Sequence, residues 1–204
     1  SLLCTNYSIL NWIKMDFRKS FNDKIILVTG GAGAIGSNLS RALADAGAAK
    51  VIILDDLSAS YSWNIPNLPN VLFVKGSITN DVDLKRVFHE KPDYIFHLAA
   101  FFANQNSVDY PERDLLVSQL GTVKMLEHAV LQGGIQRFVY AGSGCAIYGA
   151  QAPLPLKEEF ISMHLSTPYQ ISKMAGELYC NFYWHHYGFC LLYTSPSPRD
   201  LSTS

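Results

Sequence analysis

Short apolar runs alternate with longer amphipathic stretches along the chain from Lys24 onward. Each run is too short for a helix and almost unbroken in apolar character, a pattern typical of strands buried on both faces of a parallel sheet. These predicted strands span residues 25–28, 51–54, 71–74, 94–98 and 137–140. The pattern therefore places a parallel sheet at the centre of the fold.

Amphipathic stretches with helical spacing lie between and after the predicted strands. They span residues 35–46, 82–89, about 112–131 and 169–187, and a Pro- and Gly-rich stretch over 142–168 is expected to be a loop. Strands and helices that alternate at this spacing favour right-handed crossovers. The predicted fold class is α/β with a doubly wound parallel sheet, and no internal domain boundary is indicated.

Composition narrows the partners of this fold. Hydrophobic residues make up 49% of the chain and charged residues 16%, against about 25% in an average soluble chain, which excludes bulk disorder. A net charge of −1 from scattered residues offers no basic stripe to nucleic acid. No apolar run approaches the roughly 20 residues that span a bilayer, so no membrane association is expected.

Cysteine and histidine spacing argues against metal sites and disulfides. The four cysteines are widely separated, which favours a reducing cytoplasm over a disulfide framework or a zinc site. His185 and His186 are adjacent, so on a helix they point to different faces and are interpreted as part of a helix end. No metal is predicted.

A glycine-rich turn follows the first predicted strand and opens the first predicted helix. Gly30, Gly33 and Gly36 stand in the sequence TGGAGAIG, in which Ala34 and Ile35 precede the last glycine. Glycine lets the backbone turn tightly and approach a pyrophosphate without a Cβ atom in the way, and the helix N-terminus attracts the anion. The strand before the turn and the helix after it favour a dinucleotide site over a purely structural turn.

Asp55 ends the second predicted strand, 19 residues beyond Gly36. An acid about 20 residues after such a turn binds the adenosine ribose. Its carboxylate would accept a hydrogen bond from the 2′-hydroxyl and repel a 2′-phosphate, which favours NAD over NADP. The alternative is that Asp55 only caps the turn after the strand.

Tyr169 and Lys173 form a candidate chemical site. They lie four residues apart on a predicted helix and therefore on one face of it. A nearby ammonium lowers the pKa of a phenol from its usual value near 10, which suits a general acid or base. Such a pair also occurs by chance on solvated helix faces. Ser143 follows the fifth predicted strand, at the edge where open α/β sheets bind ligands, and could orient a reacting oxygen.

Six motifs together resemble the extended short-chain dehydrogenase/reductase family, and within it the NAD-dependent epimerase/dehydratase group that acts on nucleotide sugars. They are the TGGxGxIG turn, the Asp55 acid, the HLAA motif at 97–100, Gly121-Thr122, Tyr148-Gly149 and the Tyr169/Lys173 pair. They occur in the family's order over about residues 24–192. The resemblance implies a Rossmann-type sheet.

The resemblance also implies roles for individual residues. Tyr169 would exchange a proton with a sugar hydroxyl, and Lys173 would lower the pKa of Tyr169 and bind the nicotinamide ribose. NAD would take the hydride, which gives a transient keto-sugar. Cofactor contacts are further expected from Ser77, Ile78, Leu98, Ala99, Ala100, Ser118 and Tyr169 itself. His97 is expected to pack under the cofactor rather than bind a metal.

Three positions depart from the family pattern. Ser77 stands where the family has Asp, and Ser118 stands where it has Asn, so two cofactor contacts differ. The family's catalytic Ser or Thr falls on Gly144 by spacing from Tyr148, and only a shift of one residue gives Ser143 that role. Cys145 is the alternative in that position.

The segment 144–146 also separates reaction types within the family. Dehydratases and decarboxylating members carry acids there, whereas this chain has Gly, Cys and Ala. An epimerase, and hence an isomerase, is therefore favoured over a lyase. Glu158 and Glu159 could supply carboxylates but are interpreted as exposed loop charges. A simple NAD-dependent alcohol dehydrogenase or reductase and a non-catalytic NAD-binding module are the alternatives.

Partners and domain limits follow from the same resemblance. The substrate is expected to be a UDP- or GDP-sugar, and related enzymes suggest a homodimer through helices 112–131 and 169–187. Residues 24–193 are predicted to form the NAD-binding domain, preceded by an N-terminal extension over 1–23 that is non-native before Met15.

The carboxyl-terminal segment 194–204 breaks the pattern. It contains four serines, two threonines and two prolines, and it resembles translated adapter or vector sequence. It is expected to be a disordered, non-native tail. The family continues at this point with a substrate domain, which is missing here, so a truncated protein with weak NAD binding and little turnover is expected.

Overall fold

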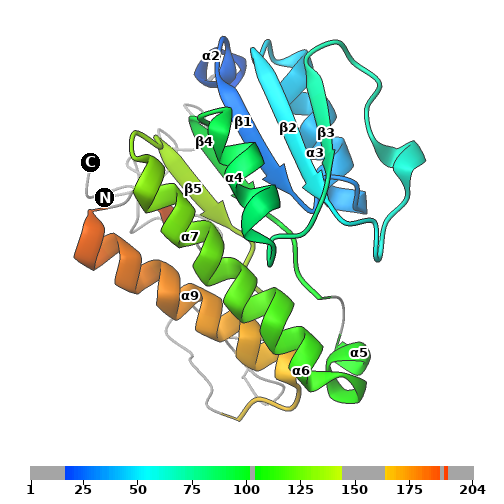
Figure 1. The fold of residues 1–204 in the computed structure, drawn as a ribbon, viewed down its shortest axis with the longest axis vertical. Coiled ribbons are helices and arrows are strands. Elements are labelled where there is room, and N and C mark those ends of the chain that lie inside the picture. Colours follow the sequence, from blue (N-terminus) through cyan, green and yellow to red (C-terminus); the bar gives the residue numbers. More distant parts are fainter. Residues whose placement is uncertain (1–16, 102–103, 144–163, 189–190, 193–204) are drawn as a thin grey trace, which may run out of the picture.

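A six-stranded parallel sheet forms the centre of the computed structural model, which describes residues 17–101, 104–143, 164–188 and 191–192. The strands are β1 Ile25–Thr29, β2 Lys50–Asp55, β3 Val71–Lys75, β4 Tyr94–His97, β5 Arg137–Tyr140 and β6 Leu191–Leu192. Their order is β3-β2-β1-β4-β5-β6 (Figure 1). The order reverses between β1 and β4, and open α/β sheets bind ligands at such a switch point.

Helices cover both faces of this sheet. They are α2 Phe17–Phe21, α3 Ala34–Asp45, α4 Asp81–His89, α5 Asn104–Asp109, α6 Pro111–Asp114, α7 Gly121–Gln132 and α9 Pro168–Tyr187, with a 3₁₀ turn, η1, at Ser62–Asn64 and a π-helix, η2, at Leu115–Leu120. In Figure 1, α4, α7 and α9 lie in front of the sheet and α3 lies behind it. None of the helices in the described part of the chain has the length and apolarity to cross a membrane.

Alternate residues of the central strands supply two separate cores. In β1, Leu27 packs into the core under α4 and α7, whereas Ile26 and Val28 pack into the core under α3. All three side chains are fully buried. Because successive strand residues point to opposite faces, a strand covered on both sides must be apolar throughout. This requirement explains the unbroken apolar runs in the sequence.

The structure confirms the α/β class and the doubly wound parallel sheet. The five predicted strands and four predicted helices are present, with ends that differ by at most one residue. Three short elements were not predicted: α2, η1 and α5. None has a periodic apolar pattern long enough to indicate a helix. Each contacts a distant segment: Phe21 of α2 packs on Tyr94, Asn64 of η1 donates to the Ala32 carbonyl, and Ser107 of α5 accepts from the Tyr169 N–H.

The predicted helix over 112–131 is one continuous helix, called the rod below, whose geometry changes along its length from α to π and back to α. It runs through α6, η2 and α7, and the residues at both junctions keep right-handed helical dihedral angles. Pro111 occupies the first turn, where its missing N–H costs nothing. The rod ends at Gly133, which has a positive φ of 67°. The π-helix lies in its middle, beside the site described below.

The described part of the N-terminal extension packs against the sheet. The Phe21 ring of α2 meets the Tyr94 ring edge-on, with 5.3 Å between ring centroids, and it also lies near Phe96. The predictions for residues 1–16 and for the tail at 194–204 lie outside the described residues.

Candidate functional site

A cavity of about 450 Å³ opens at the carboxyl edge of the sheet, at the switch point between β1 and β4. Its volume lies within the usual range for small-molecule sites. The predicted site residues that line it are Gly30, Gly33, Ala34, Ile35, Gly36, Asp55, Ser77, Ile78, Leu98, Ala99, Ala100, Tyr169 and Lys173. The fold thus brings the glycine turn, the acid and the Tyr169/Lys173 pair to one place.

Close backbone packing explains the glycines of the turn. Gly30 has a φ of 69°, and a Cβ atom there would lie 2.8 Å from the backbone nitrogen of Ala99. A Cβ atom on Gly36 would collide with the carbonyl oxygen of Gly30. No side chain caps the N-terminus of α3 at Gly33, so its first backbone N–H groups open on the cavity. These are the features of an anion-binding helix start.

Asp55 organises the same end of the cavity. One carboxylate oxygen accepts a hydrogen bond from the backbone N–H of Ala32 at 3.0 Å. The other accepts from the backbone N–H of Leu57 at 2.9 Å and the hydroxyl of Ser60 at 2.8 Å. Asp55 therefore does cap the turn after β2, and it lines the cavity as well. A carboxylate has about four acceptor positions, so one is left for a ligand hydroxyl.

Ser77 lies at the end of β3, where the family pattern has an acid. Its backbone N–H donates to the carboxylate of Asp83 at 2.9 Å, and its hydroxyl lies 2.9 Å from that of Thr79. Asp83, from the first turn of α4, thus places a negative charge beside the position that lacks one in the sequence.

Lys173 is a buried cation in the cavity wall. It is only 4% exposed, and its ammonium donates to the carbonyl oxygen of Ala141 at 2.8 Å. Burial lowers the pKa of Lys173 to about 8, although the charges of Asp114 and Glu177 act in the opposite direction. The ammonium lies 5.8 Å from the centroid of the Tyr169 ring. Phenol and amine therefore face the cavity as a close pair.

Thr167, Pro168 and Ser107 fix the start of the helix that carries this pair. Thr167 caps α9 by accepting from the backbone N–H of Gln170, and Pro168 occupies the first turn. The backbone N–H of Tyr169 donates to the hydroxyl of Ser107 in α5 at 3.0 Å. The unpredicted helix α5 thus sets where α9 begins.

His97 packs beneath the cavity floor. It is 1% exposed, and its ring nitrogens lie 2.7 Å from the Thr29 hydroxyl and 3.0 Å from the Thr122 hydroxyl. Burial lowers the pKa of His97 to about 3, so the ring is neutral. Within the described ranges no group of three or more His, Cys, Asp or Glu side chains could hold a metal ion.

Two predicted site residues are not among the described residues that line the cavity. Ser118 is 1% exposed, and its hydroxyl accepts from the backbone N–H of Phe101 and donates to Asp114. Its neighbour Val117 lines the cavity instead. Ser143 follows the lining residues Ala141 and Gly142 directly and is partly buried. Gly144, Cys145, Tyr148, Glu158 and Glu159 lie outside the described residues.

Several lining residues were missed by the sequence reasoning. They are Leu54, Asp56, Ser58, Ala59, Ser60, Gly76, Val117, Ala141 and Gly142. Position in the sequence could have predicted most of them, because they directly follow a strand or neighbour a residue that was selected. Ligand contacts in this class of fold come from the loops at the carboxyl ends of the strands.

A comparison of the sequence with models of known protein families shows which family the chain belongs to. The model of the NAD dependent epimerase/dehydratase family matches residues 26–197. The chain belongs to this family. A UDP-glucose 4-epimerase from Mycolicibacterium smegmatis is 39% identical over 176 residues, which cover 84% of this chain and 55% of that protein. The chain spans about half the length of the curated relatives it matches.

Solved structures of family members share the fold. An epimerase from Methanothermobacter thermautotrophicus is 56% identical with a TM-score of 0.84, and the match covers 87% of this chain and 52% of that one. The Bordetella bronchiseptica enzyme WbmF in complex with NAD⁺ and UDP is 30% identical with a TM-score of 0.74, over 84% of this chain and 48% of that one.

Proposed function

We propose that the chain is the NAD-binding half of a nucleotide-sugar 4-epimerase. The observation that carries this proposal is that Tyr169 and Lys173 line the same cavity as the glycine turn and Asp55. An acid–base pair and a dinucleotide cradle at one sheet edge suit the oxidation and reduction of an alcohol. The similarity to UDP-glucose 4-epimerases supports the epimerase outcome.

The cavity fits NAD by the chemistry of its walls. The Cβ-free surface of Gly30 and Gly33 and the start of α3 would hold the pyrophosphate. Asp55 would accept a hydrogen bond from the adenosine ribose hydroxyl. Leu98, Ala99 and Ala100 would line the side toward the nicotinamide. WbmF, a family member of similar fold, is described in complex with NAD⁺, which supports this cofactor. When bound, NAD supplies the acceptor and donor of a hydride.

The chain's own residues handle the proton. Tyr169 takes the proton from a sugar hydroxyl and returns it when the alcohol is re-formed on the other face. Lys173 stabilises the phenolate with its ammonium and is held in place by the Ala141 carbonyl. Ser143, next to the cavity edge, orients the reacting oxygen. The sugar passes through a keto intermediate, and its configuration changes when it turns over between the two steps.

The substrate class follows from the relatives rather than from the cavity. The relatives include UDP-glucose 4-epimerases, and WbmF is described with UDP. We propose a UDP-sugar, with a GDP-sugar as the alternative, because a relative is a GDP-6-deoxy-D-mannose reductase.

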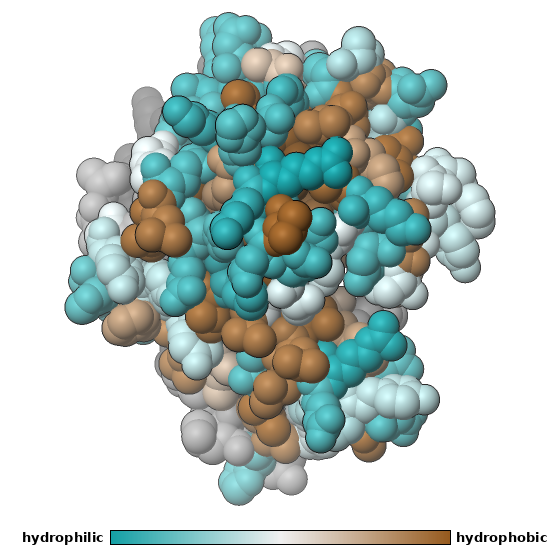
Figure 2. All heavy atoms as spheres, in the orientation of Figure 1, coloured by the Kyte–Doolittle hydropathy of each residue, from teal (hydrophilic) through white to brown (hydrophobic). Residues whose placement is uncertain are grey.

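We also propose a homodimer through helices 112–131 and 169–187. Figure 2 shows hydrophobic residues gathered over the lower half of the view, where Figure 1 places α6, α7 and α9. The exposed large hydrophobic residues of these helices are Leu115, Leu116, Leu120, Leu131, Ile171, Leu178, Tyr179, Phe182, Trp184 and Tyr187. Exposed apolar surface of this extent marks protein interfaces. Sedimentation should give a dimer, and a monomer at all concentrations would contradict it.

Calorimetric titration of the chain with NAD tests the cofactor. Binding of NAD in preference to NADP is expected, and loss of binding in Gly33→Ala would place it at the turn. The absence of NAD binding to the folded chain would overturn the proposal. In the full-length gene product, UDP-glucose and UDP-galactose should interconvert without net NADH. Net NADH would indicate a dehydrogenase, and binding without turnover would indicate a non-catalytic module.

A further inference from the structure

A buried carboxylate that the proposed chemistry does not use lies beside α9. Asp114 is the last residue of α6 and is fully buried. The hydroxyl of Ser118 donates to one of its oxygens at 3.0 Å, and the hydroxyl of Ser172 donates to the other at 2.5 Å. Ser118 belongs to the π-helix, whereas Ser172 directly precedes Lys173 on α9. One carboxylate therefore bridges the two helices at the position of Lys173.

Further hydrogen bonds lock both serine hydroxyls in their donor roles. The backbone N–H of Phe101, which follows β4, donates to the Ser118 hydroxyl at 3.0 Å. The side-chain amide of Gln119 donates to the Ser172 hydroxyl at 2.9 Å. Each serine thus accepts from one side and donates to Asp114 on the other. An acceptor-only group is the partner that this arrangement of donors requires.

The charge of Asp114 has no direct ionic partner among the described residues. No Lys, Arg or His nitrogen in them comes within 4.0 Å of its carboxylate. The charge of Asp114 acts on the buried cation Lys173, whose pKa it raises against the effect of burial. An unbalanced buried charge is costly, so two opposite charges in neighbouring buried positions compensate each other.

Other titratable and aromatic side chains also surround Lys173 and bear on the charge of its ammonium. Glu177 and Cys180 follow it on α9. The Glu177 carboxylate acts to keep Lys173 charged, whereas burial raises the pKa of the Cys180 thiol to about 12 and leaves it neutral. Tyr140 on β5 lies with its ring centroid 5.1 Å from the ammonium. His97 on β4 is neutral, and Tyr169 precedes Lys173 by one turn. Asp114 is the member that is fully buried, carries a carboxylate and reaches α9 from another helix.

We propose that Asp114 is a positioning residue for Lys173: it fixes the first turns of α9 against the π-helix and supplies the buried negative charge that balances the ammonium. The catalytic meaning of this role rests on the proposed function. The charge balance itself is a property of the folded chain and needs neither NAD nor a sugar.

The ionisation of Lys173 can be followed directly in the 204-residue chain. Lysines labelled with ¹³C at Cε are titrated by NMR, and Lys173→Arg identifies the resonance of interest. Asp114→Asn keeps the size of the side chain and removes its charge. We expect the Lys173 midpoint to fall by about one pH unit in this variant, as when a nearby opposite charge is lost.

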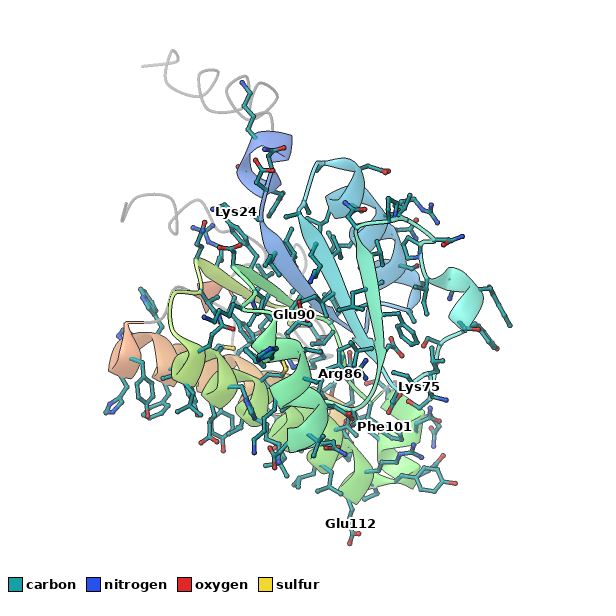
Figure 3. The ribbon with its side chains drawn as sticks, turned by 45° about the horizontal axis from the view of Figure 1, so that its top comes forward. Lys24, Lys75, Arg86, Glu90, Phe101 and Glu112 are labelled. Carbon is teal, nitrogen blue, oxygen red and sulfur yellow. The ribbon has the colours of Figure 1, made fainter. Side chains whose placement is uncertain are left out.

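Two variants separate charge from packing. Glu112→Gln makes the same change in net charge at an exposed residue, which points away from the fold (Figure 3), and should leave the midpoint unchanged. Ser118→Ala keeps the carboxylate and removes one hydrogen bond, so it should lower the melting temperature but not the midpoint. The proposal is overturned if Asp114→Asn titrates like the parent, or if Ser118→Ala lowers the midpoint equally.

A second pair keeps the test decisive where Asp114→Asn does not fold. Asp114→Glu and Asp114→Gln have equal size and differ only in charge, so a lower Lys173 midpoint in the Gln variant supports the proposal and equal midpoints overturn it. Because no cofactor is present, a chain that fails to bind NAD would refute the proposed function and leave this result standing.

Discussion

The two halves of the cavity are held together by different means. Around β1, β2 and β3 the walls are mostly backbone: a glycine turn, a helix start and loops tied to Asp55. Around β4, β5 and α9 they are side chains supported by other side chains, such as Lys173 and the Asp114 network.

The two halves also differ in how far apart along the chain their hydrogen-bonded residues lie. Asp55 bonds to residues two and five positions along the chain, as well as to the turn 23 positions before it. Asp114 and Ser172 are 58 positions apart, and Thr29 and His97 are 68 positions apart. The first half should therefore tolerate side-chain changes but not added backbone bulk, and the second half should show the reverse.

The largest effect is expected from Tyr169→Phe, which removes one hydroxyl from the side-chain half. In the full-length protein, turnover should fall by about 10²- to 10⁴-fold, the usual contribution of a general acid–base group. NAD affinity should not change, because the glycine half is intact. Tyr110→Phe, at an exposed tyrosine outside the cavity and outside the proposed interface, is the control. Equal turnover in both variants would refute the role of Tyr169.

Gly36→Ala should have the next largest effect, because it adds bulk to the backbone half. The new methyl group would collide with the Gly30 carbonyl, which cannot move without opening the turn. Urea denaturation should show a loss of about 3 kcal/mol in the free energy of unfolding, and the variant should no longer bind NAD. At Gly33 the same contact would be 3.2 Å, so Gly33→Ala should weaken NAD binding with little loss of stability. A stable Gly36→Ala chain would contradict the comparison.

His97 connects the halves and should make the fold acid-sensitive. Its pKa is lowered from 6.5 to about 3 in the fold, so between those values the unfolded chain binds a proton that the folded chain does not. The contribution of His97 to stability is therefore complete above pH 6.5 and falls by about 1.4 kcal/mol per pH unit below it, or about 2 kcal/mol at pH 5. His97→Gln should be less stable at pH 7 but lose less on acidification to pH 5. The exposed His185→Gln should lose as much as the parent, and parental acid sensitivity in His97→Gln would count against this account.

Asp55→Asn should give the smallest effect. The preference for NAD over NADP should fall by about tenfold, because one charged hydrogen bond to the ribose and the repulsion of a 2′-phosphate are lost. Asp45→Asn makes the same charge change at an exposed carboxylate that does not line the cavity and should keep the preference. Titration calorimetry with both nucleotides measures the ratio, and an unchanged ratio in Asp55→Asn would show that this carboxylate serves only the loop.

Sequence reasoning reached the backbone half more completely than the side-chain half. The turn, its strand and helix, and Asp55 could be predicted because glycine spacing and apolar runs encode them locally. The sheet followed for the same reason, since strands buried on both faces have a distinctive composition. Tyr169 and Lys173 were found by their spacing on one helix.

The supports of that pair could not be found in the same way. Asp114 stands in a polar stretch of no distinctive pattern, and its role exists only because folding brings Ser172 beside it. Ser118 was expected to touch the cofactor, but its hydroxyl is committed to Asp114 and Phe101. The helix α5 has six residues and no apolar period, yet its Ser107 positions Tyr169.

The π-helix at Leu115–Leu120 changes the angle around the helix axis between the residues before it and those after it. Asp114 and Thr122 are eight residues apart, which on a regular α-helix of about 100° per residue would separate them by about 80° around the axis. A π turn takes up about one residue more, which reduces the separation to about 20°. Both side chains can then face inward, Asp114 to α9 and Thr122 to His97. Deleting one residue from this segment would leave a regular α-helix in which the two residues are seven apart and keep a separation of about 20°.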